Sequence, residues 1–136
     1  SNKYDPRKFK PIENAEYPST KPKPGTGLWA SPVDSEFGWK QWCELEQVRD
    51  CDPANSFTFT ISGRICRVTK LVDTHDWPDH PDKDKYTYIP GFDFEKLAKR
   101  YDAIHVTMSG IRNDWLMFNT WDCESVLILN PKIINP

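Results

Sequence analysis

The amino-acid sequence predicts a single α+β domain with a small split, antiparallel or mixed β-sheet core and short helices. A chain of 136 residues is long enough to bury one core, whereas two domains would each have a marginal one. Residues 57–61 (FTFTI) alternate as a half-buried strand does. Helical segments interrupt the strands without alternating regularly with them, which favours α+β over a doubly wound sheet.

The start of the chain predicts an extended arm that packs over the core. Six of the 12 prolines lie before residue 33, and proline has no amide hydrogen to donate and restricts the residue before it. Scattered aromatic and aliphatic side chains favour packing over disorder. We therefore expect one domain over 1–136, with a proline-rich arm at about 1–26 that ends in a turn at 24–27.

The middle of the chain predicts one helix and two strands. Asp34 or Ser35 can cap a helix over 34–47, where apolar residues follow at roughly helical spacing. A loop over 50–56 leads into the alternating strand described above. A short turn then returns the chain into a second strand over 64–68, so that the two strands form a hairpin or one bent, bulged strand.

The second half begins with a polar loop over 73–90. Asp93 is a ready N-cap for a helix whose apolar residues recur at i, i+3, i+4 and i+7. Four consecutive apolar residues before Asn130 predict a buried strand. The expected elements are a helix at 93–101, a strand at 103–107, helical turns in 113–120 that bury Trp115 and Phe118, a strand at 126–129 and an edge piece at 133–134.

Charge and cysteine usage limit the function classes. A net charge of −2 argues against binding nucleic acid or an anionic membrane by bulk charge. No apolar run approaches the roughly 18 residues of a membrane span. Cys43, Cys51, Cys66 and Cys123 show no metal-type spacing, and no secretory context is visible. We interpret all four as reduced, which places the protein in a cytoplasm.

Residues 74–84 (THDWPDHPDKD) form a candidate metal site, because they hold two histidines and four carboxylates. The segment contains two prolines and no periodic frame, whereas a metal site needs ligands fixed by their neighbours. We interpret it as a solvated loop and assign no metal ligand. A mobile lid, or a metal-dependent hydrolase that uses His75 and His80, is the alternative.

Glu124 is the strongest candidate for a catalytic side chain. It opens a strand that must be buried, so its carboxylate is held rigidly and partly desolvated. Such a group suits stabilising a developing cation or accepting a proton. A carboxylate paired with lysine or arginine is the alternative, and Asp122 competes for the role. His105 lies inside a strand and is interpreted as a core histidine.

Glycines and tryptophans supply candidate binding residues. Gly25 and Gly27 would let the backbone approach a phosphate, although a simple turn into a strand explains them as well. Six tryptophans are many for a chain of 136 residues. Two of them stand at helical spacing and are expected in the core. Three others, Trp29, Trp77 and Trp121, flank polar or glycine-rich segments, where an indole can stack on a planar ligand or a cation.

These segments together resemble the ADP-ribosyltransferase superfamily. The family's middle motif, a Gly-aromatic-x-Ser strand before a helix, is similar to residues 27–31 (GLWAS). Its C-terminal segment often runs through a helix, a Tyr-Asp-Gly-type turn, a strand, a loop and a glutamate that opens an apolar strand ending in Asn-Pro or Asp-Pro. Residues 101–104 (YDAI) and 124–131 (ESVLILNP) resemble this order. Small phage and mobile-element proteins show the same order, which suggests such an origin.

The resemblance implies an ADP-ribosyltransferase-like fold that binds NAD and transfers ADP-ribose to a macromolecular target. It implies that Glu124 stabilises the oxocarbenium ion and that Ser31 orients Glu124 or the ribose. For Glu124 and Ser31 to take these roles, Glu124 and the Trp29–Ser31 segment must face one shared hollow. The cofactor-binding residues that it implies are Lys23, Gly25, Gly27, Trp29 and Trp121.

The family's first motif, an arginine or histidine that anchors the dinucleotide, has no clean counterpart in the sequence. Arg7, Lys10 and Lys23 are candidates by position only. This departure supports an alternative, a non-catalytic phage-encoded inhibitor or interaction module that binds a host protein or a nucleotide-like signal. The abundance of aromatic residues favours the alternative, because tryptophan and tyrosine dominate binding hot spots.

Overall fold

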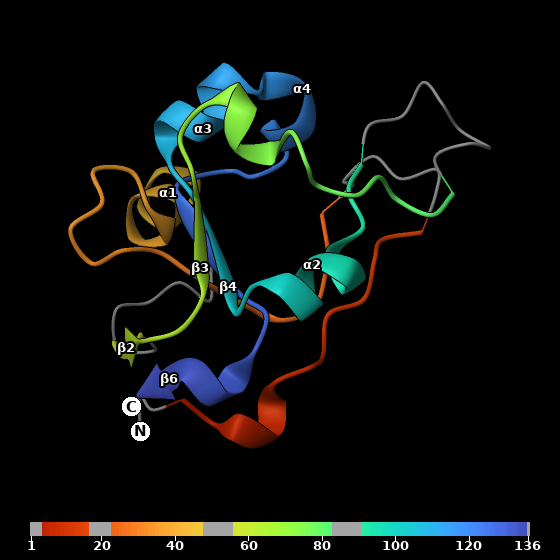
Figure 1. Ribbon diagram of the computed structural model, residues 1–136. Coiled ribbons are helices and arrows are strands. Elements are labelled where there is room, and N and C mark those ends of the chain that lie inside the picture. Colours follow the sequence, from red (N-terminus) through yellow and green to blue (C-terminus); the bar gives the residue numbers. More distant parts are fainter. Residues whose placement is uncertain (1–3, 17–22, 48–55, 83–90, 136) are drawn as a thin grey trace.

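The computed structural model describes residues 4–16, 23–47, 56–82 and 91–135 (Figure 1). Within them, a four-stranded sheet has the order β1-β5-β4-β3, and β2 pairs with β6 in a second, two-stranded sheet. Parallel pairing joins β3 to β4, and the other pairs are antiparallel. The strands are β1 (Leu28–Ala30), β2 (Thr60–Ile61), β3 (Ile65–Val68), β4 (Ala103–Val106), β5 (Ser125–Ile128) and β6 (Ile134–Asn135). The α+β class with a small mixed sheet is confirmed.

Short helices surround this sheet. The strand β4 leads directly into α3 and α4, which lie together at one end of the molecule, and α2 precedes β4 (Figure 1). The α-helices are α1 (Trp39–Glu46), α2 (Phe94–Arg100), α3 (Met108–Asn113) and α4 (Trp115–Phe118). The described residues also form the 3-10 helices η1 (Pro6–Lys8), η3 (Leu71–Thr74) and η4 (Pro131–Ile133). The Asp93 side chain accepts a hydrogen bond from the Lys96 amide, which confirms the predicted cap of α2.

The two faces of the four-stranded sheet carry different cores. Cross-strand partners such as Ile104 and Leu127 point to the same face, and successive residues of a strand point to opposite faces. We call the face with Ile104 and Leu127 the aromatic face, because Phe92, Phe94, Phe118, Trp77 and Trp121 pack on it. We call the other face, with Ala103 and Val126, the second face, and it packs against Ile133 and Ile134.

Three of the predicted elements differ from the structure. The expected hairpin over 57–68 is wrong, because β2 pairs with β6 and β3 pairs with β4. The helix expected over 34–47 begins only at Trp39, whose amide donates to the Ser31 hydroxyl at 2.8 Å. Of the helical turns in 113–120, α4 buries Phe118 but leaves Trp115 64% exposed.

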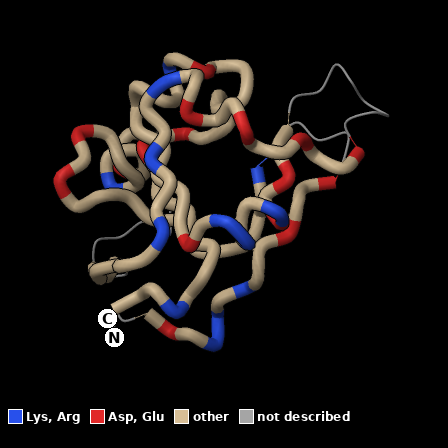
Figure 2. Tube along the Cα trace, in the orientation of Figure 1, with Lys and Arg blue, Asp and Glu red and all other residues tan. Residues whose placement is uncertain are grey.

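Charged side chains are spread over many elements. Figure 2 shows lysine and arginine interspersed with aspartate and glutamate along the trace, with no element of a single sign standing out. This distribution accords with the net charge of −2. In the part of the chain that the structure describes, no helix is long and apolar enough to cross a membrane.

Asp102 links β3, β4 and the end of β5. Its carboxylate accepts a hydrogen bond from the Arg64 amide at 2.8 Å and one from Asn130 Nδ2 at 3.1 Å. Its Oδ1 also lies 3.3 Å from the Arg64 guanidinium. The backbone and side-chain hydrogen bonds of Arg64 lower the pKa of Asp102 to about 2. Folding therefore stabilises the ionised form of Asp102 relative to its protonated form.

Replacement of Asp102 by asparagine is expected to lower the free energy of unfolding at pH 7 by about 2 kcal/mol. Since the pKa of Asp102 is depressed by folding, this contribution is present above its unfolded value of about 4 and is lost as the pH falls toward 2. Urea unfolding at pH 7 and at pH 2.5 checks the prediction. An equal stability difference between D102N and the wild type at both pH values would contradict it.

Candidate functional site

A polar cavity of about 400 Å³ opens on the second face of the sheet. Its wall consists of the loop at 32–37, Arg67 on β3, His105 on β4, the start of α3, and Glu124 directly before β5. Arg67 and His105 are register partners in the parallel pair, so they stand side by side on this face. We call this cavity the Glu124 pocket.

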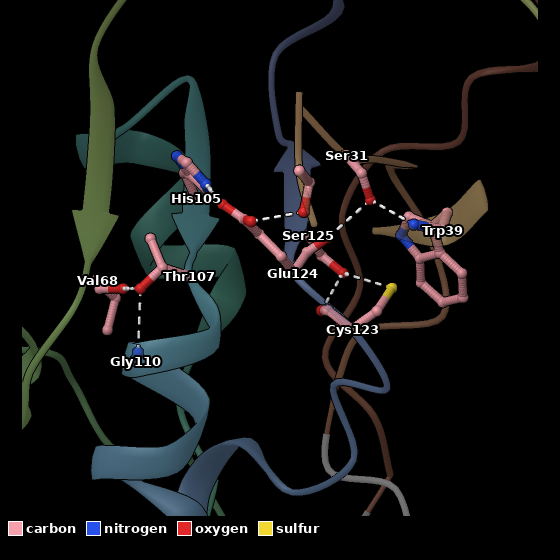
Figure 3. A network of polar contacts seen from close by, with 10 residues as sticks. Ser31, Trp39, Val68, His105, Thr107, Gly110, Cys123, Glu124 and Ser125 are labelled. Carbon is pink, nitrogen blue, oxygen red and sulfur yellow. Dashed lines mark hydrogen bonds and ion pairs between the residues drawn. The ribbon is translucent and has the colours of Figure 1, made fainter. Parts of the chain in front are cut away.

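Glu124 is held through both its side chain and its backbone (Figure 3). One carboxylate oxygen accepts a hydrogen bond from the Ser35 hydroxyl at 2.6 Å, and the other lies 2.6 Å from Nε2 of His105. The Glu124 amide donates to the Phe37 carbonyl at 3.0 Å. Its carbonyl accepts from the Ser31 hydroxyl at 2.7 Å. The carboxylate is therefore positioned by contacts that span about ninety residues of sequence.

The surroundings of Glu124 favour its ionised form. Burial acts to raise the pKa of Glu124, but hydrogen bonds from Ser35 and His105, together with the charges of His105 and Arg67, outweigh it. The net pKa of Glu124 is lower than its usual value. The side chain is only 17% exposed, so the pocket contains a fixed, partly desolvated negative charge at neutral pH.

Ser31 lies behind Glu124 rather than in the pocket. Its hydroxyl accepts from the Trp39 amide and donates to the Glu124 carbonyl, so it joins the start of α1 to the segment before β5 (Figure 3). Ser31 therefore orients Glu124 through the backbone, and it does not line the space in front of the carboxylate.

Trp29 and Glu124 point to opposite faces of the sheet. Trp29 pairs with Leu127 on the aromatic face, and its ring centroid lies 4.7 Å from that of Trp121 in an edge-to-face contact. Trp121 is only 2% exposed. The shared hollow that we expected between Glu124 and the Trp29–Ser31 segment is therefore wrong, since β1 presents Trp29 to the core.

Lys23 also belongs to this aromatic cluster. Its Nζ donates to the Thr120 carbonyl at 2.5 Å, lies 3.3 Å from the Asp122 carboxylate and stands 5.3 Å from the Trp29 ring centroid. These contacts satisfy the ammonium group inside the protein. Asp122, the competitor of Glu124, is correspondingly engaged with Lys23 and does not line the Glu124 pocket.

The two candidate phosphate-binding glycines do not line the Glu124 pocket either. Gly27 has a φ of +81°, and its amide donates to the Lys10 carbonyl at 2.8 Å. A Cβ atom there would lie 2.9 Å from the Ile128 carbonyl oxygen. Close approach to β5 therefore explains Gly27. A Cβ atom on Gly25 would meet nothing within 4 Å.

The histidine-rich segment is described only as far as residue 82, and Asp84 lies outside the described residues. His75 Nδ1 lies 2.7 Å from the Val72 carbonyl oxygen, and His80 Nε2 lies 2.7 Å from that of Ala15. Among the described residues, no group of three or more histidine, cysteine or acidic side chains could hold a metal ion. Trp77 of this segment is a core residue on the aromatic face.

The cysteines differ in redox state. Cys43 is disulfide-bonded, so the interpretation of all four as reduced is wrong, and Cys51 lies outside the described residues. The cytoplasmic prediction depended on reduced cysteines, and it stays a prediction without that support. Cys66 and Cys123 are free thiols. Burial raises the pKa of Cys123 to about 11, which makes it a poor nucleophile at neutral pH.

Sequence reasoning missed Arg67 and His105. Both occupy the polar positions of strands whose alternate residues enter the core, as Val68 and Ile104 do. That alternation was a usable signal, but it did not show that the two strands are neighbours. His105, predicted as a core residue, instead faces the Glu124 pocket.

Comparisons with protein-family models, with curated proteins and with solved structures found no match for this chain. The chemistry of the site is therefore inferred from its geometry. A fixed, ionised carboxylate beside an imidazole can stabilise a cation, and a guanidinium at the same cavity can hold an anionic oxygen.

Proposed function

We propose that the Glu124 pocket binds the nicotinamide and ribose portion of NAD and that the protein transfers ADP-ribose to a macromolecule. The observation that carries this proposal is the ionised Glu124 carboxylate, fixed by Ser35 and His105 at the wall of a polar cavity. The cavity volume of about 400 Å³ is within the range of small-molecule sites.

The charges at the pocket support the binding of the nicotinamide and ribose portion beside Glu124. Asp34, Glu36 and Glu124 contribute carboxylates to its wall, and the nicotinamide ring of NAD carries a positive charge. Arg67 lines the same cavity and offers a guanidinium that can bind a phosphate through two hydrogen bonds. In this proposal Arg67 binds the phosphates of NAD, which is the role that we expected for Lys23 and the glycines.

The reaction would draw on the fixed charge of Glu124. The bond between ribose C1′ and the nicotinamide nitrogen breaks, and its electron pair leaves with neutral nicotinamide. The ribose becomes an oxocarbenium ion, which the Glu124 carboxylate stabilises more strongly than the ground state. A nucleophilic oxygen or nitrogen of the acceptor then forms the new bond to C1′ and releases its proton to water. His105 and Ser35 act as positioning residues for the carboxylate.

Substitution of Arg67 by glutamine is expected to weaken NAD binding by about tenfold or more, because one charged hydrogen-bonding partner is lost. Isothermal titration of NAD into the wild type and the variant measures the change. R7Q is the matched control, since Arg7 is exposed on η1 and pairs with Asp5. Equal NAD affinity in R67Q and R7Q, or no NAD binding by the wild type, would refute the proposed ligand site.

A second candidate function is a non-catalytic interaction module. One observation favours it: the described residues include a group of large exposed apolar side chains on η3 and α4. A thermal-shift titration separates the candidates, because a ligand that binds the folded state raises the melting temperature. A rise with NAD supports the transferase, and a flat response across nucleotides supports the module.

A further inference from the structure

A second cavity, of about 560 Å³, lies at the end of the molecule formed by η3 and α4. Leu71, Val72, Phe92 and Met117 give it a largely apolar wall. None of the residues that line the Glu124 pocket lines this cavity. We call it the η3–α4 cavity. Any function that it has is therefore separable from the proposed NAD site.

Exposed apolar side chains lie on both elements: Leu71 and Val72 line the cavity, and Trp115 and Leu116 stand in the chain between Asp114 and Met117, which also line it. Leu71, Val72, Trp115 and Leu116 are 61%, 57%, 64% and 67% exposed, and we call them the η3–α4 patch. They account for four of the seven large apolar side chains that are exposed among the described residues. Residues of both elements line the η3–α4 cavity, and the Thr74 side chain at the end of η3 hydrogen-bonds Asp114, the residue before α4. Such a concentration of exposed apolar surface is typical of a site that another molecule covers.

The cavity also holds a buried carboxylate. Asp114 lines it and is only 7% exposed. Burial raises the pKa of Asp114, and the Met117 amide and the Thr74 hydroxyl offset this only in part. Among the residues that the structure describes, no cationic side chain pairs with Asp114, and the other acidic residue in the wall is Asp79.

The cavity wall also includes His75, whose Nδ1 lies 2.7 Å from the Val72 carbonyl oxygen. Lys70 precedes η3 and Arg112 lies on α3, but neither lines the cavity. A buried carboxylate is costly when it has no countercharge, so a cation that enters the cavity gains a desolvated ion pair. The complementary ligand therefore combines a positive charge with adjacent apolar surface.

We propose that the η3–α4 patch docks a segment of a partner protein that inserts a lysine or arginine toward Asp114 and packs apolar side chains on the patch. Leu71 and Val72 on one side, with Trp115 and Leu116 on the other, provide the apolar contacts. The buried Asp114 carboxylate provides the charge that selects a basic anchor. Aromatic and basic anchors of this kind are common hot spots in protein interfaces.

The test uses the full chain and a phage-displayed library of random heptapeptides. Enriched peptides are expected to carry lysine or arginine beside leucine, phenylalanine or tryptophan. The most enriched peptide, synthesised with a fluorophore, is then titrated by fluorescence polarisation. We expect L116S to weaken its binding at least fivefold and D114N at least tenfold. Replacing the basic residue of the peptide by norleucine should remove the effect of D114N, as coupling of the two charges requires.

Matched controls lie on α1. Leu45 is 68% exposed, almost the same as Leu116, so L45S removes equal apolar surface elsewhere, and E44Q removes a carboxylate from the same helix. Both variants should bind the peptide as the wild type does. Should D114N fail to fold, L71S and L116S still test the patch, because both leucines are exposed.

Three results would overturn the proposal. The first is a library without enrichment, or with enrichment of acidic peptides. The second is peptide binding that L71S and L116S leave unchanged. The third is a concentration-dependent dimer in sedimentation velocity that L116S abolishes, because a second copy of the chain would then be the occupant.

Discussion

Replacement of Glu124 by glutamine is expected to slow the release of nicotinamide from NAD by about 10²–10³-fold, the cost of removing one preorganised electrostatic group. Glutamine keeps the shape of the side chain and still accepts the Ser35 hydrogen bond, which is 2.6 Å long in the wild type. It removes the negative charge that the oxocarbenium ion requires. Chromatographic measurement of nicotinamide at saturating NAD gives the rate, and the melting temperature reports whether the fold survives.

Control measurements connect this loss to the charge at position 124. E44Q removes a carboxylate from α1, outside the Glu124 pocket, and should leave the rate unchanged. Because the pKa of Glu124 lies below its usual value, wild-type activity should persist at pH 5 and fall only at lower pH. An E124Q variant that releases nicotinamide at the wild-type rate, with an unchanged melting temperature, would reject the transferase proposal.

Replacement of Gly110 by alanine is expected to destabilise the fold by about 3 kcal/mol, the upper part of the usual range for overpacking. A Cβ atom at this position would overlap the Val68 carbonyl oxygen and lie 3.2 Å from Cγ1 of Val106. The Thr107 hydroxyl donates to the same carbonyl and accepts from the Gly110 amide, each at 3.0 Å (Figure 3). Helix α3 therefore cannot move away from β3 without breaking this network.

Urea unfolding of G110A and G25A separates the close contact from the general effect of replacing glycine. A Cβ atom on Gly25 would meet nothing within 4 Å, so G25A should be neutral or slightly stabilising. Equal stability of G110A and the wild type would show that α3 can shift at low cost. Such a result would contradict the rigid packing of α3 on β3.

The sequence predicted well those elements that local signals specify. The Asp93 cap and the spacing of the apolar residues located α2, and the run of apolar residues before Asn130 located β5. It failed where pairing joins distant segments. The pattern of 57–61 indicated a strand, but only Thr60–Ile61 forms β2, and nothing local showed that β2 pairs with β6 rather than with the next strand.

The candidate site was predictable to a similar degree. Glu124 was found because an acid directly before a buried strand has a fixed, partly desolvated place. Arg67 and His105 were missed because their juxtaposition arises from the parallel register of β3 and β4, which only the tertiary structure provides. The same limit explains Trp29, since its pairing with Leu127 decides that it faces the core and not the pocket.

The central place of β5 has a consequence for how the protein folds during its synthesis. Strand β5 lies between β1 and β4, yet Ser125–Ile128 is translated long after Leu28–Ala30. A nascent chain that has not reached this point leaves β1 without its partner and one edge of β4 unpaired. Pairings between such distant segments form slowly, and unpaired edges favour aggregation. The growing polypeptide should therefore depend on chaperones until β5 has left the ribosome.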